Sequence, residues 1–120
     1  MGLRDAYFAQ LTRRQEAEEA AARPYDEAHA KLKALFQDIM ADRELLDSIL
    51  AEVELSGGEL QIDPGPIMIR AIVDKAGDYH LTYEIKANDD PEVRTIAVKS
   101  ISDIEEAIAG LLVQYPHDRG

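Results

Sequence analysis

Residues 77–86, GDYHLTYEIK, decide the fold class of this chain, because two kinds of side chain alternate along them. One kind is aromatic or aliphatic: Tyr79, Leu81, Tyr83 and Ile85. The other kind is polar: His80, Thr82, Glu84 and Lys86. Successive side chains of a strand point to opposite faces. This period of two therefore predicts an antiparallel strand with one buried face and one face open to solvent or to a partner.

The sequence around this strand repeats the pattern. Apolar alternation returns over residues 67–74 and 93–99, and a short apolar stretch covers residues 59–62. Turn-forming residues occupy 88–92. Residues 100–115 have instead the spacing of an amphipathic helix. The second half of the chain predicts an antiparallel meander of three to four strands followed by a C-terminal helix.

The first half of the chain predicts helices. Residues 3–23 contain no glycine, and Pro24 either begins a second helix or kinks a single long one. Asp42 is placed to cap a further helix. Gly57 and Gly58 are expected to end the helical segment, because glycine is the residue most often found just past a helix.

These patterns together predict an α+β fold with two N-terminal helices, or one long kinked helix, ahead of the meander and the C-terminal helix. The chain of 120 residues has the size of one domain. We expect that domain to span residues 1–120, with a helical half over 1–56 and a sheet-and-helix half over 57–120.

The long helical segment carries an apolar stripe that a short sheet cannot cover completely. Its residues recur at heptad-like spacing and are Leu32, Phe36, Ile39, Leu46, Leu50 and Val53. A helix of about 30 residues is roughly 45 Å long, whereas a seven-residue strand is about 23 Å long. The apolar residues Leu3 to Leu11 of the same chain would cover the rest of the stripe if the chain reverses sharply at Pro24. Otherwise a second copy covers it, and we expect the stripe to form a helical interface in a homodimer, of the kind that coiled coils use.

The charge of the chain indicates its partners. It has 24 acidic and 13 basic residues, a formal net charge of −11, and both halves are acidic. Such a field repels phosphates and anionic lipid headgroups, so we expect no direct nucleic-acid binding and no membrane binding. A protein with a basic surface is the expected partner. The chain shows no signal-peptide pattern at residues 1–15, so the cytoplasm is the expected location.

No motif in the sequence assembles catalytic chemistry. Residues 26–29 spell DEAH, a helicase box, but the phosphate-binding loop that such chemistry requires is missing. The chain contains no cysteine, and its histidines, His29, His80 and His117, fall on separate predicted elements. The row His80, Thr82 and Glu84 places neighbours roughly 6–7 Å apart, which is too far for a direct proton relay. We expect no catalytic residue, no metal site and no cofactor.

The function that these patterns favour is that of a non-catalytic, acidic protein-binding or adaptor module that works as a homodimer. The polar row His80, Thr82 and Glu84 is then a partner-facing sheet surface. The alternative is a nucleic-acid mimic, a phage or anti-host type of inhibitor that occupies a basic groove of a DNA-handling enzyme. Mimicry requires carboxylates clustered on one face, whereas charge that serves solubility is scattered.

Overall fold

The computed structural model describes residues 2–86 and 91–116, and its element order confirms the α+β class. The elements are α1 (Leu3–Ala41), α2 (Arg43–Ile49), β1 (Glu52–Ser56), β2 (Glu59–Asp63), β3 (Ile67–Val73), β4 (Tyr79–Ile85), β5 (Glu92–Ile96) and α3 (Ile101–Gln114). The strands form one sheet in the order β1-β2-β3-β4-β5, and neighbouring strands are antiparallel. The turn expected over 88–92 falls largely outside the described residues.

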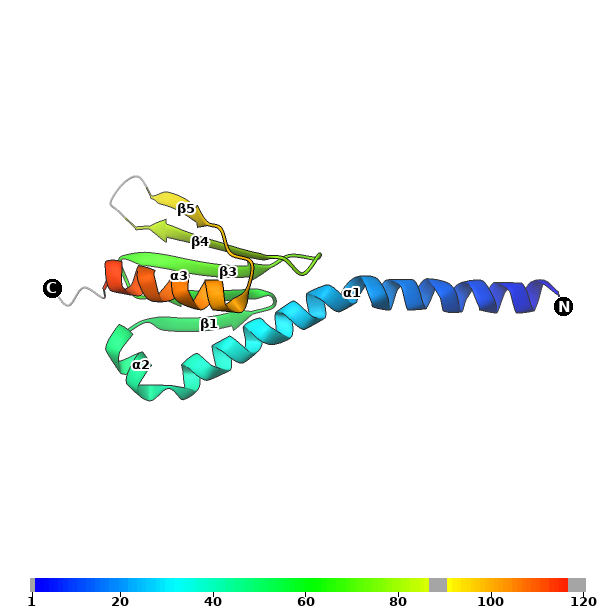
Figure 1. Cartoon of the computed structure of the whole chain (residues 1–120), viewed down its shortest axis with the longest axis horizontal. Coiled ribbons are helices and arrows are strands. Elements are labelled where there is room, and N and C mark those ends of the chain that lie inside the picture. The colour runs from blue at the N-terminus through cyan, green and yellow to red at the C-terminus, as the bar shows by residue number, and fades with distance from the viewer. Residues whose placement is uncertain (1, 87–90, 117–120) are drawn as a thin grey trace.

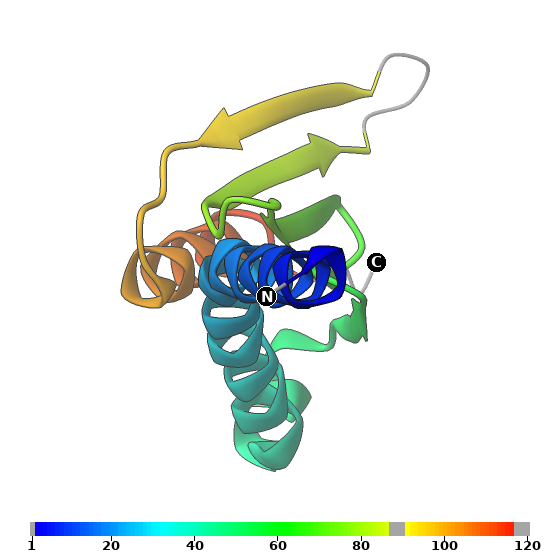
Figure 2. The ribbon, with the colours of Figure 1, turned by 90° about the vertical axis from the view of Figure 1, so that its right-hand side faces the viewer.

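The core lies between one face of the sheet and two helices. The second half of α1 and the whole of α3 lie on this face (Figure 1), and the end-on view in Figure 2 shows that both helices lie on the same side of the strands. The largest fully buried aliphatic side chains come from α1, the sheet and α3, and are Leu32, Leu60, Ile62, Ile67, Ile69, Leu81 and Ile104. Leu81 and Tyr83 point into this core, as the alternation along their strand predicted.

The sheet has one strand more than the predicted maximum of four, and this strand, β1, lies where the sequence predicted helix. The helical half ends at Ile49 and not at residue 56. Leu50 adopts the left-handed conformation (φ 50°, ψ 39°), which stops α2 and reverses the chain. Gly57, with φ 59°, then connects β1 to β2 in a tight hairpin, so the two glycines form a strand turn and not a helix end.

The break between the N-terminal helices lies at Asp42 and not at Pro24. The Asp42 carboxylate accepts a hydrogen bond from the backbone N–H of Leu45 (3.1 Å) and so caps α2. Helix α1 continues through Pro24 over 39 residues and is bent, as a proline inside a helix causes (Figure 1). The single long kinked helix that the sequence allowed is therefore the observed form of residues 3–41.

Residues 3–23 of α1, called the arm from here on, extend beyond the rest of the molecule. Every side chain that the structure describes in the arm is exposed. The arm points away from the sheet (Figure 1), and the molecule as a whole measures 77 × 33 × 20 Å along its principal axes. The arm therefore contributes surface and no core.

The β3–β4 turn and β4 contact α1 at the point where the arm joins the body of the protein. Gly77, in the β3–β4 turn, lies so close to α1 that an added Cβ would be 2.5 Å from the carbonyl oxygen of Pro24. One turn further on, the Tyr79 hydroxyl donates a hydrogen bond to the carbonyl oxygen of Ala28 (3.2 Å). These contacts fix the point at which α1 leaves the body of the protein.

Candidate binding groove

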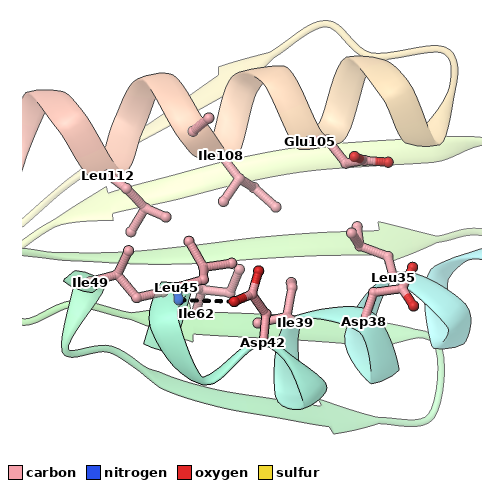
Figure 3. Close-up of a pocket in the computed structure, with 11 residues that line it drawn as sticks. Leu35, Asp38, Ile39, Asp42, Leu45, Ile49, Ile62, Glu105, Ile108 and Leu112 are labelled. Carbon is pink, nitrogen blue, oxygen red and sulfur yellow. Dashed lines mark hydrogen bonds between the residues drawn. The ribbon is translucent and has the colours of Figure 1, made fainter. Parts of the chain in front are cut away.

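An apolar groove lies between the end of α1, α2 and α3, with β2 beneath it. Its apolar lining consists of Leu35, Ile39, Leu45, Ile49, Ile62, Ile108, Ala109 and Leu112. Figure 3 shows Ile49, Leu45 and Leu112 pointing toward the space between α2 and α3. The groove exists because α2 turns away from the line of α1 at Asp42 and does not close over α3.

Carboxylates stand at the rim of this groove. Asp38 lies on α1 and Glu105 on α3, so they face the opening from opposite walls (Figure 3). Asp42 lies between α1 and α2 and is held in place by its hydrogen bond from Leu45. The described lining contains no basic side chain. An occupant thus meets an apolar floor and a negatively charged margin.

The size of the groove is compatible with the apolar side chains of a protein segment. Its volume is about 270 Å³. Pockets for small ligands usually enclose roughly 300–1,000 Å³ and bury most of the ligand. Grooves that bind an amphipathic helix instead receive a few apolar anchors from one face of that helix. The groove has room for such anchors and offers carboxylates to cationic residues beside them.

The six residues of the expected helical interface lie along the seam between α1, α2 and β1. Leu32 and Ile39 are buried in the core of the same chain, with 0% and 8% of their surface exposed. Phe36, Leu46 and Val53 are partly buried against that core. Leu50, between α2 and β1, is the exposed member of the set. The interface itself stays a prediction.

The polar row of β4 lies on the sheet face that α1 and α3 leave uncovered. His80 is exposed, and Thr82 and Glu84 are partly exposed. The imidazole of His80 lies 2.7 Å from a carboxylate oxygen of Asp74. This hydrogen bond is the main reason why the pKa of the Asp74 carboxyl is lowered, and a second one, from the backbone N–H of Asp78, contributes.

Cations interrupt the acidic residues of this uncovered face. Arg70 pairs with Glu59 (3.7 Å), and Lys86 pairs with Asp63 (2.7 Å). Arg70 also stands in a register row that crosses the sheet through Gln61 and Thr82. The face is therefore a mixture of charges and neutral polar groups, and its carboxylates form no continuous row among these residues.

The histidine of the DEAH sequence, His29, contacts the sheet and a neighbouring aromatic ring. Its Nε2 atom lies 2.6 Å from the carbonyl oxygen of Gly57, and its ring stacks on Tyr25 with centroids 5.7 Å apart. Across residues 2–86 and 91–116, no group of three or more potential metal ligands comes together. His117 lies outside these residues.

Sequence reasoning found the apolar residues of α3 but missed the groove. Leu45 and Ile49 were not singled out, although their spacing of four places them on one face of a helix. One pair of apolar residues is too short a pattern to predict a buried helix face, since α2 has only seven residues. Which walls face each other depends on how three helices dock, and no local pattern encodes that.

Comparisons of the chain with protein-family models, with curated proteins and with solved structures found no match. Within the described part of the chain, no helix combines the length and the apolar character that crossing a membrane requires. The residues of the groove and of the arm are therefore the basis for the functional proposals that follow.

Proposed function

We propose that this protein is a non-catalytic, acidic binding module, homodimeric in its working form, that holds an amphipathic segment of a basic protein partner in the groove. The single observation that carries this proposal is the apolar floor bordered by Asp38, Asp42 and Glu105. Apolar anchors give such a complex its affinity, and charge complementarity selects the partner and speeds association.

The net charge of −11 supports the same choice of partner. A protein with this charge attracts basic surfaces over a distance of about one Debye length, roughly 8 Å at physiological salt. The rim carboxylates then act at short range, where the apolar floor excludes water from the contact. A neutral or acidic helix of the same apolar pattern would keep the contact with the apolar floor but would lose both electrostatic contributions.

The test uses a fluorescein-labelled helical peptide of leucine and lysine, and the same peptide with glutamate in place of lysine. We expect the lysine peptide to bind the wild type and the glutamate peptide not to bind. Reversing the rim with Asp38→Lys and Glu105→Lys should weaken binding of the lysine peptide by about tenfold or more, because it places like charges opposite each other across the interface.

Any acidic protein attracts a cationic peptide, so the matched control reverses two carboxylates away from the groove. Glu52→Lys with Glu54→Lys, on the exposed edge strand β1, changes the net charge by the same amount. If this control weakens binding as strongly as the rim variant, the peptide is held by net charge and the groove is not the site. Equal binding by all three proteins would also overturn the proposal.

The nucleic-acid-mimic alternative has less support from the described surface. Mimicry needs carboxylates at regular spacing on one face, whereas Arg70 and Lys86 divide those of the uncovered sheet face. The alternative predicts that the protein displaces duplex DNA from a DNA-handling enzyme in a competition assay. The binding-module proposal predicts no such displacement.

A further inference from the structure

The arm exposes large apolar side chains along one side. The exposed fractions are 85% for Leu3, 58% for Tyr7, 51% for Phe8 and 38% for Leu11. The rings of Tyr7 and Phe8 meet edge to face with centroids 5.4 Å apart, so they form one apolar surface. Helices in proteins gain most of their stability from the packing of such a face, and nothing in the described body packs on this one.

The two halves of the arm differ in side-chain size. Residues 3–11 carry the large apolar groups, and residues 17–22 are rich in alanine. Positions 3, 7, 10, 14 and 17 are separated by four and three residues in alternation, which is the spacing of a helix seam that packs on another helix. One end of this seam is bulky and the other end is small.

The two halves differ in charge as well. Residues 3–14 contain Arg4, Arg13 and Arg14 against Asp5 alone. Residues 15–23 contain Glu16, Glu18 and Glu19 against Arg23 alone. The arm is therefore positive at its N-terminal end and negative where it meets the body.

We infer that the arm pairs with the arm of a second copy of this chain, antiparallel, about a two-fold axis near residue 12. This pairing places the bulky half of each arm on the alanine-rich half of the other. Tyr7 lies beside Ala17 of the second copy, and Leu3 lies beside its residues 20–22. Each positive half also meets a negative half, with Arg4 approaching Glu19 of the second copy.

The other possible arrangements are less favourable. A parallel pair would place bulky half on bulky half and positive end on positive end, which removes both kinds of complementarity. The arm also cannot fold back onto its own sheet while α1 stays helical, because the helix continues through Pro24 and the Gly77 turn abuts that residue. A second copy is the partner that matches both the size and the charge of the arm.

This inference rests on the homodimeric part of the proposed function and replaces its expected interface. Leu32 and Ile39 are buried in the core of their own chain, whereas the apolar side chains of the arm are exposed. Binding in the groove is measured with the peptide, and pairing of the arms is measured by mass, so one can fail while the other stands.

The first test is the mass of the full chain by light scattering. The wild type is expected at twice 13.4 kDa. Leu3→Glu with Leu11→Glu should give 13.4 kDa with an unchanged strand signal in circular dichroism, because neither residue belongs to the core. The matched control is Val113→Glu with Val93→Glu, whose side chains are 82% and 63% exposed and lie outside both the arm and the groove. It should remain dimeric.

Three results would overturn the inference: a monomeric wild type, a dimeric arm variant, or a control that becomes monomeric. The last would place the contact at β5 and α3 and not at the arm. Each result is readable whether or not the lysine peptide binds the groove.

The second test is the orientation of the two arms. Arg4→Glu and Glu19→Arg should each weaken self-association by about fivefold or more, since each creates two like-charge contacts per dimer. An equimolar mixture of the two variants should recover the wild-type dissociation constant, because the mixed dimer restores both opposite-charge contacts. Parallel arms would place residue 4 beside residue 4 and residue 19 beside residue 19, where the wild type already has like charges, so neither single variant would weaken self-association by these contacts.

A distance measurement gives an independent reading. The chain has no cysteine, so Gly2→Cys carries a single nitroxide label without further engineering. Antiparallel arms with an axis near residue 12 separate the two labels by about 30 Å, at a rise of 1.5 Å per residue. A label separation near the 8–10 Å spacing of two packed helices would mean parallel arms and would overturn the inference.

Discussion

The imidazole Nε2 of His29 lies 2.6 Å from the carbonyl oxygen of Gly57, 28 residues away along the chain. A carbonyl can only accept, so the histidine donates this hydrogen bond from its Nε2–H. The bond joins α1 to the β1–β2 turn, and the ring of Tyr25 stacks on the same imidazole. The histidine of the DEAH sequence thus connects the long helix to the sheet.

Removing this connection should lower stability. We expect His29→Ala to reduce the free energy of unfolding by about 1 kcal/mol, the usual net contribution of one hydrogen bond, with further loss from the stacked ring. Urea denaturation measures the change. Asp26→Ala, an exposed substitution in the same DEAH sequence, is the control and should change stability by less than about 0.5 kcal/mol. A larger effect at Asp26 than at His29 would contradict this account.

The Gly77 contact gives a second stability prediction. Gly77→Ala introduces a Cβ about 2.5 Å from the Pro24 carbonyl oxygen at a backbone φ of 85°. Gly57→Ala also places an alanine in the left-handed region, at φ 59°, but its Cβ meets nothing within 4 Å. Each should cost about 1–2 kcal/mol from the left-handed backbone alone. Gly77→Ala should cost clearly more in thermal unfolding, and equal losses would show that the turn does not press on α1.

The Asp74–His80 pair predicts a dependence on pH. The pKa of Asp74 is lowered from its ordinary value of 3.8, chiefly by the hydrogen bond from His80. A carboxyl with a lowered pKa in the folded state stabilises the fold above its unfolded pKa, and the contribution is lost as pH falls through the folded value. We therefore expect His80→Ala to lower the melting temperature near pH 5 and to have less effect in strong acid.

The same variant should raise the pKa of Asp74 toward its ordinary value. Carboxyl-detected NMR titration of wild type and His80→Ala measures this directly. An Asp74 pKa that is equal in the two proteins would mean that the backbone N–H of Asp78, and not the imidazole, sets it.

Leu50 offers a test of backbone conformation against side-chain packing. Its left-handed φ of 50° suits asparagine and disfavours a β-branched residue. We expect Leu50→Asn to be tolerated within about 0.5 kcal/mol and Leu50→Ile to be clearly more destabilising than Leu50→Asn, although isoleucine keeps the apolar volume. The opposite order would mean that the Leu50 side chain is buried in an interface, as the heptad pattern suggested.

The dispersed acidic charge predicts that the protein does not bind duplex DNA at physiological salt. Counterion release favours proteins that neutralise phosphates, and a net charge of −11 opposes it. A gel-shift assay with a known DNA-binding protein as positive control measures this. Sub-micromolar retention of the duplex would show that a local basic surface outweighs the net charge.

Much of the fold could be predicted because the spacing of apolar residues along the chain indicates the strands and the C-terminal helix. Leu81 and Tyr83 alternate with polar neighbours, and the strand they define lies where expected, with the expected face buried. The C-terminal helix followed from the spacing of Ile104, Ile108 and Leu111, which are buried in the structure.

The prediction was wrong at residues 52–56, where the apolar residues fit both a strand and a helix. Glu52–Ser56 alternates like a strand, yet Val53 also continues the heptad of the preceding helix. The left-handed turn at Leu50 decides between these alternatives, and leucine gives no sequence signal for that conformation. The bond between His29 and Gly57 and the walls of the groove depend on tertiary docking, so residue patterns could not predict them.

The continuity of α1 through Pro24 makes the direction of the arm's apolar side a matter of residue counting. A helix turns by about 100° and rises by about 1.5 Å per residue. One residue inserted between Leu11 and Pro24 would swing that side through more than a quarter turn, while an insertion of seven would return it almost to its original azimuth, displaced by roughly 10 Å. The number of residues in this segment therefore determines in which direction the apolar side of the arm points relative to the sheet.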